Sequence, residues 1–252
     1  MKRDFTSVWV FSAIMLTGTA NAEINGFGDR EGFTAGIGVI ADWAPYDGAD
    51  TPSTTPVPYL AYDWENAHLG VDGFDYSFFK TDQVTLTASI VPRWSFGDPE
   101  DSPLFEDIER DTALEAGLGA EISLGHLFLR GSFRQDISNV HTGYEGASEI
   151  GIEAEFGKFE VETTIGSVYR DKKLSAHLYG VASDEARVGL SAYAPDAAWY
   201  PNIRAELLYP IGRSMGVLAF TEYEQLGSDA KNSPLVSGDD DTTVGLVFLK
   251  RF

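Results

Sequence analysis

The hydrophobic and polar positions of this chain alternate with a period of two. Within 113–122, apolar side chains fill the even positions from Leu114 to Ile122, and glutamate or glycine fills the positions between them. Successive side chains of a β-strand point to opposite faces, so such a segment predicts a strand with one apolar and one polar face. The same pattern predicts eleven strands, at 33–41, 57–64, 67–74, 84–92, 113–122, 125–134, 147–157, 159–170, 199–209, 213–225 and 243–252. No long helix or linker interrupts the series, which indicates one all-β domain.

The length and spacing of these segments favour a transmembrane β-barrel over a soluble β-sandwich, whose strands also alternate. The repeats are about 10 residues long, the length that a tilted strand needs to cross a bilayer. Tight turns near Gly125, Gly157-Lys158 and Pro210–Gly212 alternate with long polar loops over roughly 93–112, 135–146, 170–198 and 226–241. This is the arrangement of short periplasmic turns and longer outer loops. Aromatic residues at the strand ends would form the interfacial girdles: Tyr59, Tyr62, Trp64, Trp94, Tyr169, Trp199, Tyr200, Tyr209 and Tyr223.

The number of strands follows from parity. Single-chain bacterial barrels have an even number of strands, so eleven segments need one more or one fewer. If the C-terminus is periplasmic, every long loop after residue 92 lies outside and the connection at 80–82 lies on the periplasmic side. An additional crossing must then lie within 67–80, with a turn near Asp72-Gly73. We therefore predict an antiparallel barrel of twelve strands, with ten as the alternative if the first segment is not in the barrel.

The N-terminus has the three parts of a secretory signal peptide. Lys2 and Arg3 precede an apolar run over 5–17, and Ala20-Asn21-Ala22 forms an A-x-A cleavage site. The run is too short to cross a bilayer as a helix, which takes about 20 apolar residues. We expect residues 1–22 to be removed by cleavage between Ala22 and Glu23, which leaves 23–252 as the barrel.

Composition narrows the possible partners. Cleavage removes two basic residues and one acidic residue, so the net charge of −21 becomes −22. A nucleic-acid partner needs clustered lysine and arginine and is not expected. The chain has no cysteine, so no disulfide supports the fold. No later segment of the sequence has the pattern of a transmembrane helix, so if the mature protein lies in a membrane it must be a closed barrel, because only helices and barrels satisfy every backbone group in lipid. We expect outer-membrane lipid and lipopolysaccharide to surround it.

The C-terminal segment carries a candidate assembly signal. Val244, Leu246, Phe248 and the terminal Phe252 share one face of the last predicted strand, which Lys250 interrupts. A final amphipathic strand that ends in phenylalanine resembles the signal that the barrel assembly machinery recognises in bacterial outer-membrane proteins. We therefore expect export through the inner membrane and insertion into the outer membrane of a Gram-negative cell.

The residues that carry catalysis are scarce. The chain has four histidines, His68, His126, His141 and His177, and the last lies in the longest loop near Ser175 and Ser183. Asp184-Glu185 beside His177 is a weak match to the acidic pairs of outer-membrane proteases. Two acidic runs, Asp98–Asp101 and Asp239–Asp241, lack the ligand spacing of a calcium loop. We therefore predict no enzymatic activity, no metal and no cofactor.

The inward faces of the predicted strands carry charge of both signs. Glutamates are the more numerous, and four arginines accompany them: Glu115, Glu121, Glu153, Glu155, Glu160, Glu162, Glu206, Glu222 and Glu224, with Arg130, Arg134, Arg170 and Arg204. A lumen lined with acidic side chains could conduct cations. Ion pairs between arginine and glutamate could equally fill a narrow lumen. The sequence leaves both outcomes open.

Several stretches, in order along the chain, resemble the MipA/OmpV family of outer-membrane proteins. Residues 44–50 and 56–59 are similar to the family's first loop and second strand, and 86–89 to its next recurring strand. Tyr179–Val181, Ala186-Arg187 and 190–193 resemble its most distinctive loop. Residues 199–208 followed by 231–236 match its C-terminal order. The resemblance covers essentially the whole mature chain and is weakest around Glu153.

The resemblance implies an outer-membrane barrel without known catalytic residues, and it supplies no site residues. The family's namesake is a scaffold that joins a murein hydrolase, a membrane-bound lytic transglycosylase, to a bifunctional murein synthase. Other members are described as outer-membrane antigens or adhesins. We expect a non-enzymatic scaffold whose contacts lie on the periplasmic turns and on 23–32. The alternatives are a small diffusion channel and an adhesin or antigen that uses the loop 170–198.

Overall fold

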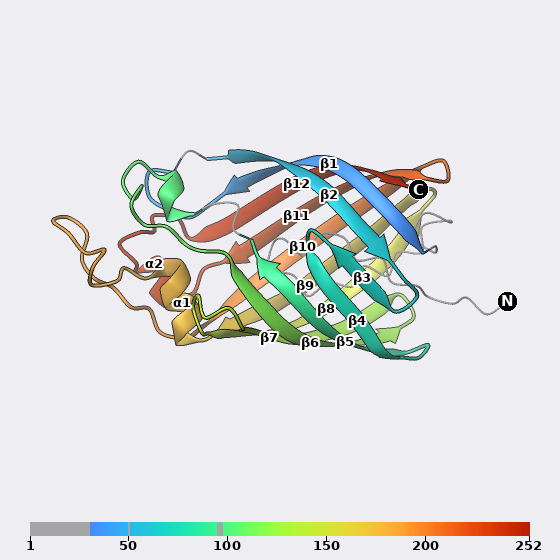
Figure 1. Cartoon of the computed structure of the whole chain (residues 1–252), viewed down its shortest axis with the longest axis horizontal. Coiled ribbons are helices and arrows are strands. Elements are labelled where there is room, and N and C mark those ends of the chain that lie inside the picture. The colour runs from blue at the N-terminus through green and yellow to red at the C-terminus, as the bar shows by residue number, and fades with distance from the viewer. Residues whose placement is uncertain (1–30, 50, 95–97) are drawn as a thin grey trace.

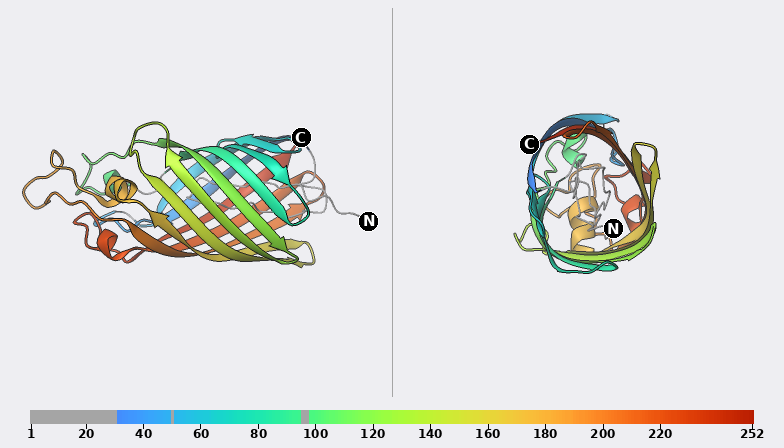
Figure 2. Two further views of the ribbon diagram at one scale, coloured as in Figure 1. Left: turned by 90° about the horizontal axis from the view of Figure 1, so that it is seen from below. Right: turned by 90° about the vertical axis from the view of Figure 1, so that its right-hand side faces the viewer.

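The chain forms a closed antiparallel β-barrel in the computed structural model, which describes residues 31–49, 51–94 and 98–252. Neighbouring strands in the sequence are neighbours in the sheet, and β1 pairs with β12 to close the ring (Figures 1 and 2). The strands are β1 (Gly32–Trp43), β2 (Ser53–Asp63), β3 (Ala67–Gly70), β4 (Gly73–Lys80), β5 (Val84–Arg93), β6 (Ala113–Leu124), β7 (Leu127–Asp136), β8 (Tyr144–Phe156), β9 (Phe159–Arg170), β10 (Ala198–Ile211), β11 (Met215–Gln225) and β12 (Asp240–Arg251).

The predicted count of twelve strands is confirmed, and the alternative of ten is wrong. The segment 33–41 belongs to β1, which pairs with both β2 and β12. The prediction of one strand over 67–74 is corrected, because the chain turns at Val71-Asp72 and 67–80 forms the short hairpin β3–β4. The additional crossing therefore lies where parity required it, although β3 has only four residues.

Turns and loops alternate between the two ends of the barrel. The two-residue turns at 125–126 and 157–158 and the turn at 212–214 lie at the end that also holds the C-terminus. Gly125, Gly157 and Gly212 have φ of 77°, 69° and 75°, a conformation that glycine adopts at little cost. The opposite end carries the long loops with η1 (Pro99–Asp101), α1 (Lys172–Tyr179) and α2 (Ser228–Lys231) (Figure 1). The alternation of the hydrophobic pattern did not predict these short helices.

The period-two pattern places one apolar face of the wall outward. Leu118 in β6 is 60% exposed, and its neighbours along the strand alternate between outward and inward positions. The last strand behaves in the same way, with Val244, Leu246 and Phe248 outward and exposed. No helix among the described residues is long and apolar enough to cross a membrane. The outward apolar belt is therefore the surface that faces lipid.

Candidate functional site

The lumen between β6 and β9 is tied together by buried arginines. Arg130 in β7 binds Glu121 in β6 at 2.9 Å and Glu162 in β9 at 3.3 Å. Its third partner, Glu149 in β8, lies 3.6 Å away. Arg130 also stacks over the ring of Phe128 at 4.4 Å from its centroid. One guanidinium thus joins three neighbouring strands, because their inward side chains converge on it.

A second cluster lies nearer the outer end of the same strands. Glu145 in β8 is its centre and binds three arginines: Arg93 at 3.2 Å, Arg134 at 3.2 Å and Arg170 at 3.3 Å. Arg93 in β5 also binds Glu115 in β6, with Nε 2.7 Å from Oε1 and Nη2 2.9 Å from Oε2. These contacts link β5 to β8 across two intervening strands.

Arg170 makes the best-formed pair of this second cluster. Its two terminal nitrogens donate to the two carboxylate oxygens of Glu224 in β11, at 2.6 and 2.7 Å. The guanidinium is fully buried and stacks on the ring of Tyr200 at 4.3 Å. Two-point arginine–carboxylate pairs of this kind are strong and geometrically specific. The inward charges thus form ion pairs that join β9 to β11 past β10 and β5 to β8 past two strands.

The other side of the lumen is apolar at its middle. Inward side chains of β1, β2, β10, β11 and β12 form one cluster: Ile40, Val57, Tyr59, Ala61, Leu208, Leu218, Phe220, Val247 and Leu249. Val71, at the tip of the β3–β4 hairpin, packs against it. Towards the periplasmic end, Asp63 binds both His68 at 2.6 Å and Arg251 at 3.1 Å. The sequence analysis did not assign this apolar cluster, and its prediction that Tyr59 and Tyr200 belong to the interfacial girdles is wrong, because both side chains are buried on the inner face.

The outer loops pack together into one unit, which we call the loop cap (residues 44–49, 98–112, 171–197 and 226–239). Side chains from all four loops share an apolar cluster with inward residues of β9 and β10: Tyr46, Phe105, Ile108, Val168, Tyr179, Val181, Leu190, Tyr200, Leu226, Ala230 and Leu235. Hydrogen bonds join the loops, for example from Tyr193 Oη to the carbonyl of Asp229 at 2.8 Å. The cap therefore lies over the mouth of the lumen as a packed layer, and α1 lies within the outline of the barrel in Figure 2.

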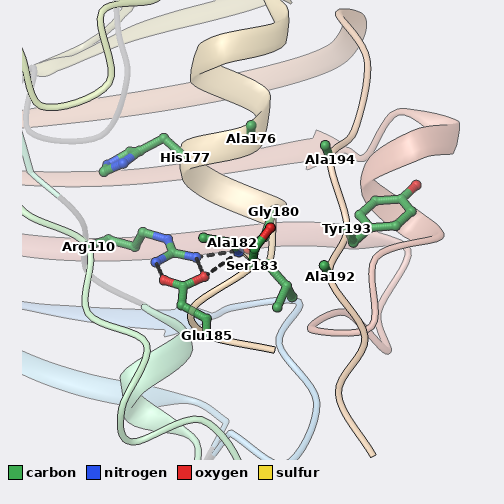
Figure 3. Close-up of a pocket in the computed structure, with 11 residues that line it drawn as sticks. Arg110, Ala176, His177, Gly180, Ala182, Ser183, Glu185, Ala192, Tyr193 and Ala194 are labelled. Carbon is green, nitrogen blue, oxygen red and sulfur yellow. Dashed lines mark hydrogen bonds and ion pairs between the residues drawn. The ribbon is translucent and has the colours of Figure 1, made fainter. Parts of the chain in front are cut away.

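A surface pocket of about 480 Å³ lies within the loop cap (Figure 3). Arg110 and Glu185 form an ion pair at 2.7 Å along one wall, and Arg110 also donates to the carbonyl of Gly180 at 2.8 Å. Glu185 accepts from the backbone N–H of Ala182 at 2.7 Å. The opposite wall is formed by Ala192, Tyr193 and Ala194, so most of the lining is small or apolar.

The pocket contains His177 and Ser183, which the sequence offered as a base and a nucleophile. Burial, together with the positive charge of Arg110 and Arg93, lowers the pKa of His177 to about 4, so the imidazole is neutral at physiological pH. Glu185, the acidic neighbour in the sequence, is bound to Arg110 and not to the imidazole. This geometry does not assemble the acid–base–nucleophile chain that hydrolysis requires.

The remaining candidate residues are placed as follows. The acidic run at 98–101 forms the η1 turn, and the run at 239–241 spans the start of β12. Among the described residues, no group of three or more histidine, aspartate or glutamate side chains could hold a metal ion. Phe252 follows β12 and is 69% exposed, with the Lys250 ammonium over its ring at 4.8 Å. Its role in assembly stays a prediction. The cleavage residues Ala20, Ala22 and Glu23 lie outside the described residues.

The fold and its lipid-facing belt define an outer-membrane β-barrel. Residues 35–252 match the family described as MltA-interacting protein MipA, and the chain belongs to this family. It is 24% identical over 212 residues to the putative outer membrane protein YiaT of Escherichia coli K12, covering 82% of this chain and 86% of that protein. It is 25% identical over 196 residues to the outer membrane protein OmpV of Vibrio cholerae, covering 77% and 76%. The chain is accordingly a protein of the outer membrane.

Comparison with solved structures gives matches at low sequence identity. The NanC porin is 8% identical and has a TM-score of 0.48, with 86% of this chain and 99% of that chain covered. The CymD monoaromatic hydrocarbon channel is 11% identical with a TM-score of 0.42, covering 88% and 89%.

Proposed function

We propose that this protein is a non-enzymatic interaction barrel that links a murein hydrolase and a murein synthase at the periplasmic face of the outer membrane. The observation that carries the proposal is the network of buried ion pairs on the inner wall together with the loop cap over its outer mouth. The pairs join β5 to β8 and β9 to β11, and the four outer loops pack into one layer. A barrel built in this way is suited to present surfaces to a partner.

The murein hydrolase is proposed as a partner because of the family to which the chain belongs. The family's description names an interaction with MltA, and the resemblance noted in the sequence implies a scaffold for murein enzymes. The periplasmic face of this chain is the side from which such enzymes would be reached. The proposed scaffold role in this chain is supported by that family relation and by the ion pairs and loop cap described above.

One concave feature makes the periplasmic rim a suitable contact surface. A recess of about 330 Å³ lies between the turns at 81–83 and 125–126, lined by Lys80, Asp82, Gln83, Ser123 and Glu153 among others. Short turns alone expose little area, whereas a specific interface buries ~800 Å² per partner. The recess offers a cavity that a partner side chain can fill, and residues 23–32 would add further area.

The proposal is tested by capture of purified murein enzymes on the folded barrel. We expect replacement of Lys80, Asp82 and Gln83 by alanine to weaken capture of the murein hydrolase. Replacement of the turn at 212–214 by Gly-Asn-Gly serves as the matched control and should leave capture unchanged if the recess is the contact. Capture that survives replacement of every periplasmic turn, or large stable conductance of the purified barrel in planar bilayers, would reject the scaffold.

A further inference from the structure

A row of aromatic rings crosses the outward face of four neighbouring strands near the outer rim of the barrel. The ring centroid of Phe133 in β7 lies 5.5 Å from that of Tyr144 in β8. The Tyr144 ring lies 6.2 Å from Tyr169 in β9, and the Tyr169 ring lies 5.2 Å from Trp199 in β10. We call these four residues the aromatic row. Phe133, Tyr144 and Trp199 are exposed, so the row lies on the surface that faces the membrane.

Aliphatic side chains continue this outward face towards the middle of the membrane. Ile150 of β8 pairs in register with Ile165 of β9, which pairs in turn with Ile203 of β10, and all three are exposed. The isoleucines of β9 and β10 lie about 13 Å along their strands from the rings of Tyr169 and Trp199. The face is thus aromatic at its outer edge and aliphatic below it. This is the order expected where the headgroup region of a membrane meets the hydrocarbon.

Two exposed lysines lie above the aromatic row. Lys172 and Lys173 are the first residues of α1, which follows β9 at the outer end of the barrel (Figure 1). The Lys172 ammonium lies 2.5 Å from the carboxylate of Asp196, just before the start of β10. The Lys173 ammonium donates to the carbonyl of Thr142 at 3.4 Å, just before the start of β8. The two positive charges therefore lie on either side of the end of β9, next to the strand ends that carry the rings.

This lysine pair differs from the rest of the loop cap, in which acidic residues outnumber basic ones. Lys173 has no carboxylate partner among the described residues, and the pair of Lys172 with Asp196 is exposed to solvent on both sides. Such an exposed pair is weak and can exchange its partner. The other basic residues of the cap are bound to carboxylates: Arg110 to Glu185, Arg187 to Asp107 and Lys231 to Asp239. An anionic group at the membrane surface is therefore attracted to Lys172 and Lys173.

We propose that Lys172, Lys173 and the aromatic row form a docking surface for the lipid A part of lipopolysaccharide. The two ammonium groups bind a phosphate of the lipid A headgroup, the rings contact its sugars, and its acyl chains lie on the isoleucines below. Phosphate suits the lysine pair because it carries more than one negative charge and offers several acceptor oxygens. A lipid is favoured over a free anion because the same face continues into aromatic and aliphatic side chains at the depth of the membrane. This surface is independent of the periplasmic contact proposed above.

The test measures binding of bisphosphorylated lipid A to the full-length mature protein, folded in detergent, by native mass spectrometry. The double variant Lys172→Ala with Lys173→Ala should weaken binding about tenfold, because two charge-assisted contacts to phosphate are lost. Lys158→Ala, in the turn at the opposite end of β9, is the matched control and should bind as the unmodified protein does. Equal affinity of the double variant and the unmodified protein would overturn the proposal.

Changes in the ligand supply the second measurement, which needs only the unmodified protein. Lipid A without phosphate should bind as weakly as bisphosphorylated lipid A binds to the double variant, and equal binding of the two forms would reject the phosphate contact. Inorganic phosphate or phosphatidylglycerol that displaces lipid A at equal concentration would assign the surface to anions in general and overturn the choice of lipid A.

Trp199→Ala tests the aromatic row separately from the charges. It should weaken binding of both forms of lipid A by a similar factor, because the ring contacts the part that they share. Unchanged binding in this variant would remove the rings from the docking surface and contradict the proposal. All variants are first checked for folding by their different migration in unheated and boiled gel samples.

Discussion

The two sides of the lumen are lined by different kinds of side chain. The strands β5 to β9 fill their half with arginines and glutamates that bind one another across two or three strands. The strands β1, β2 and β10 to β12 contribute a cluster of aliphatic and aromatic side chains to theirs, beside the buried Arg204 and Glu206 of β10. The charged side has continuous strand pairing, whereas β2 pairs with the β3–β4 hairpin only at Ala61–Asp63.

The two linings differ in how far they depend on fixed neighbouring strands. Buried charges need every partner in place, so a half lined with ion pairs requires fixed neighbouring strands. An apolar surface has no such requirement. The following predictions would break or sharpen this comparison.

The largest effect is expected on the charged side. Arg170→Met leaves Glu224 and one contact of Glu145 without their cation in a fully buried site, which should destabilise the barrel by ~3–5 kcal/mol. The double variant Arg170→Met with Glu224→Leu removes both charges and should recover most of that loss. Urea unfolding of the barrel in lipid vesicles measures both. Equal stability of the single variant and the unmodified protein would mean that the ion pairs do not support the lumen.

The next effect concerns the outward face. Leu118→Arg places a charge at the middle of the lipid-facing belt and should cost ~2–4 kcal/mol. The inward neighbour Gly117 is a poor control, because a Cβ there would lie 2.6 Å from Ser89 Oγ and 2.7 Å from Arg134 Cγ. A Cβ at Gly119 meets nothing nearer than 4.0 Å, so Gly119→Arg is the better inward control and should be milder. Leu118→Arg folding as well as Gly119→Arg would contradict the assignment of faces.

A smaller effect is expected on the edge of β2 that faces away from β1, which pairs with β3 only at Ala61–Asp63. Leu60 accepts from Val71 on this edge, so position 58 points the same way. Pro58→Ala restores an N–H there, and an unsatisfied donor costs ~1–3 kcal/mol. Pro103→Ala in an exposed loop is the control and should change stability by less than ~0.5 kcal/mol. Unfolding in urea measures the difference between the two. If both variants are as stable as the unmodified protein, an added donor at position 58 finds a partner on this edge.

Much of this fold follows from the sequence because a barrel wall is encoded locally. Alternation identified the strands, and parity alone required the crossing within 67–80, which four residues of β3 provide. The partners of each charge could not be read in the same way. Arg93 and Glu145 are central to the lumen, but Arg93 lies at the very end of its strand and was not assigned to the inward set. Their pairing across β6 and β7 depends on the tilt and curvature of the closed barrel.

The loop cap was the least predictable part, because its hydrophobic and polar residues do not alternate with a regular period. Its order comes from apolar residues dispersed over four loops, such as Tyr46, Phe105 and Leu235, which meet only in the folded chain. A local signal did exist for α1, since Asp171 caps it by accepting from the backbone N–H of Leu174 at 3.0 Å. The free edge of β2 also had a signal in Pro56 and Pro58, because proline within a strand indicates an edge.

The smallest effect is expected in the loop cap above the charged side, where pH should act through His177. The pKa of this histidine falls to about 4 in the folded protein from an ordinary value of 6.5, because of burial and nearby cations. Between these two pH values the opened cap binds more protons than the closed cap, so closure weakens as the pH falls from about 6.5 towards 4. Limited proteolysis of 182–197 should therefore be faster at pH 5 than at pH 7. His177→Gln, which does not titrate, is the control and should show a smaller change with pH. Equal acceleration in both proteins would assign the pH response to another group and would remove His177 from the account of how the cap stays closed.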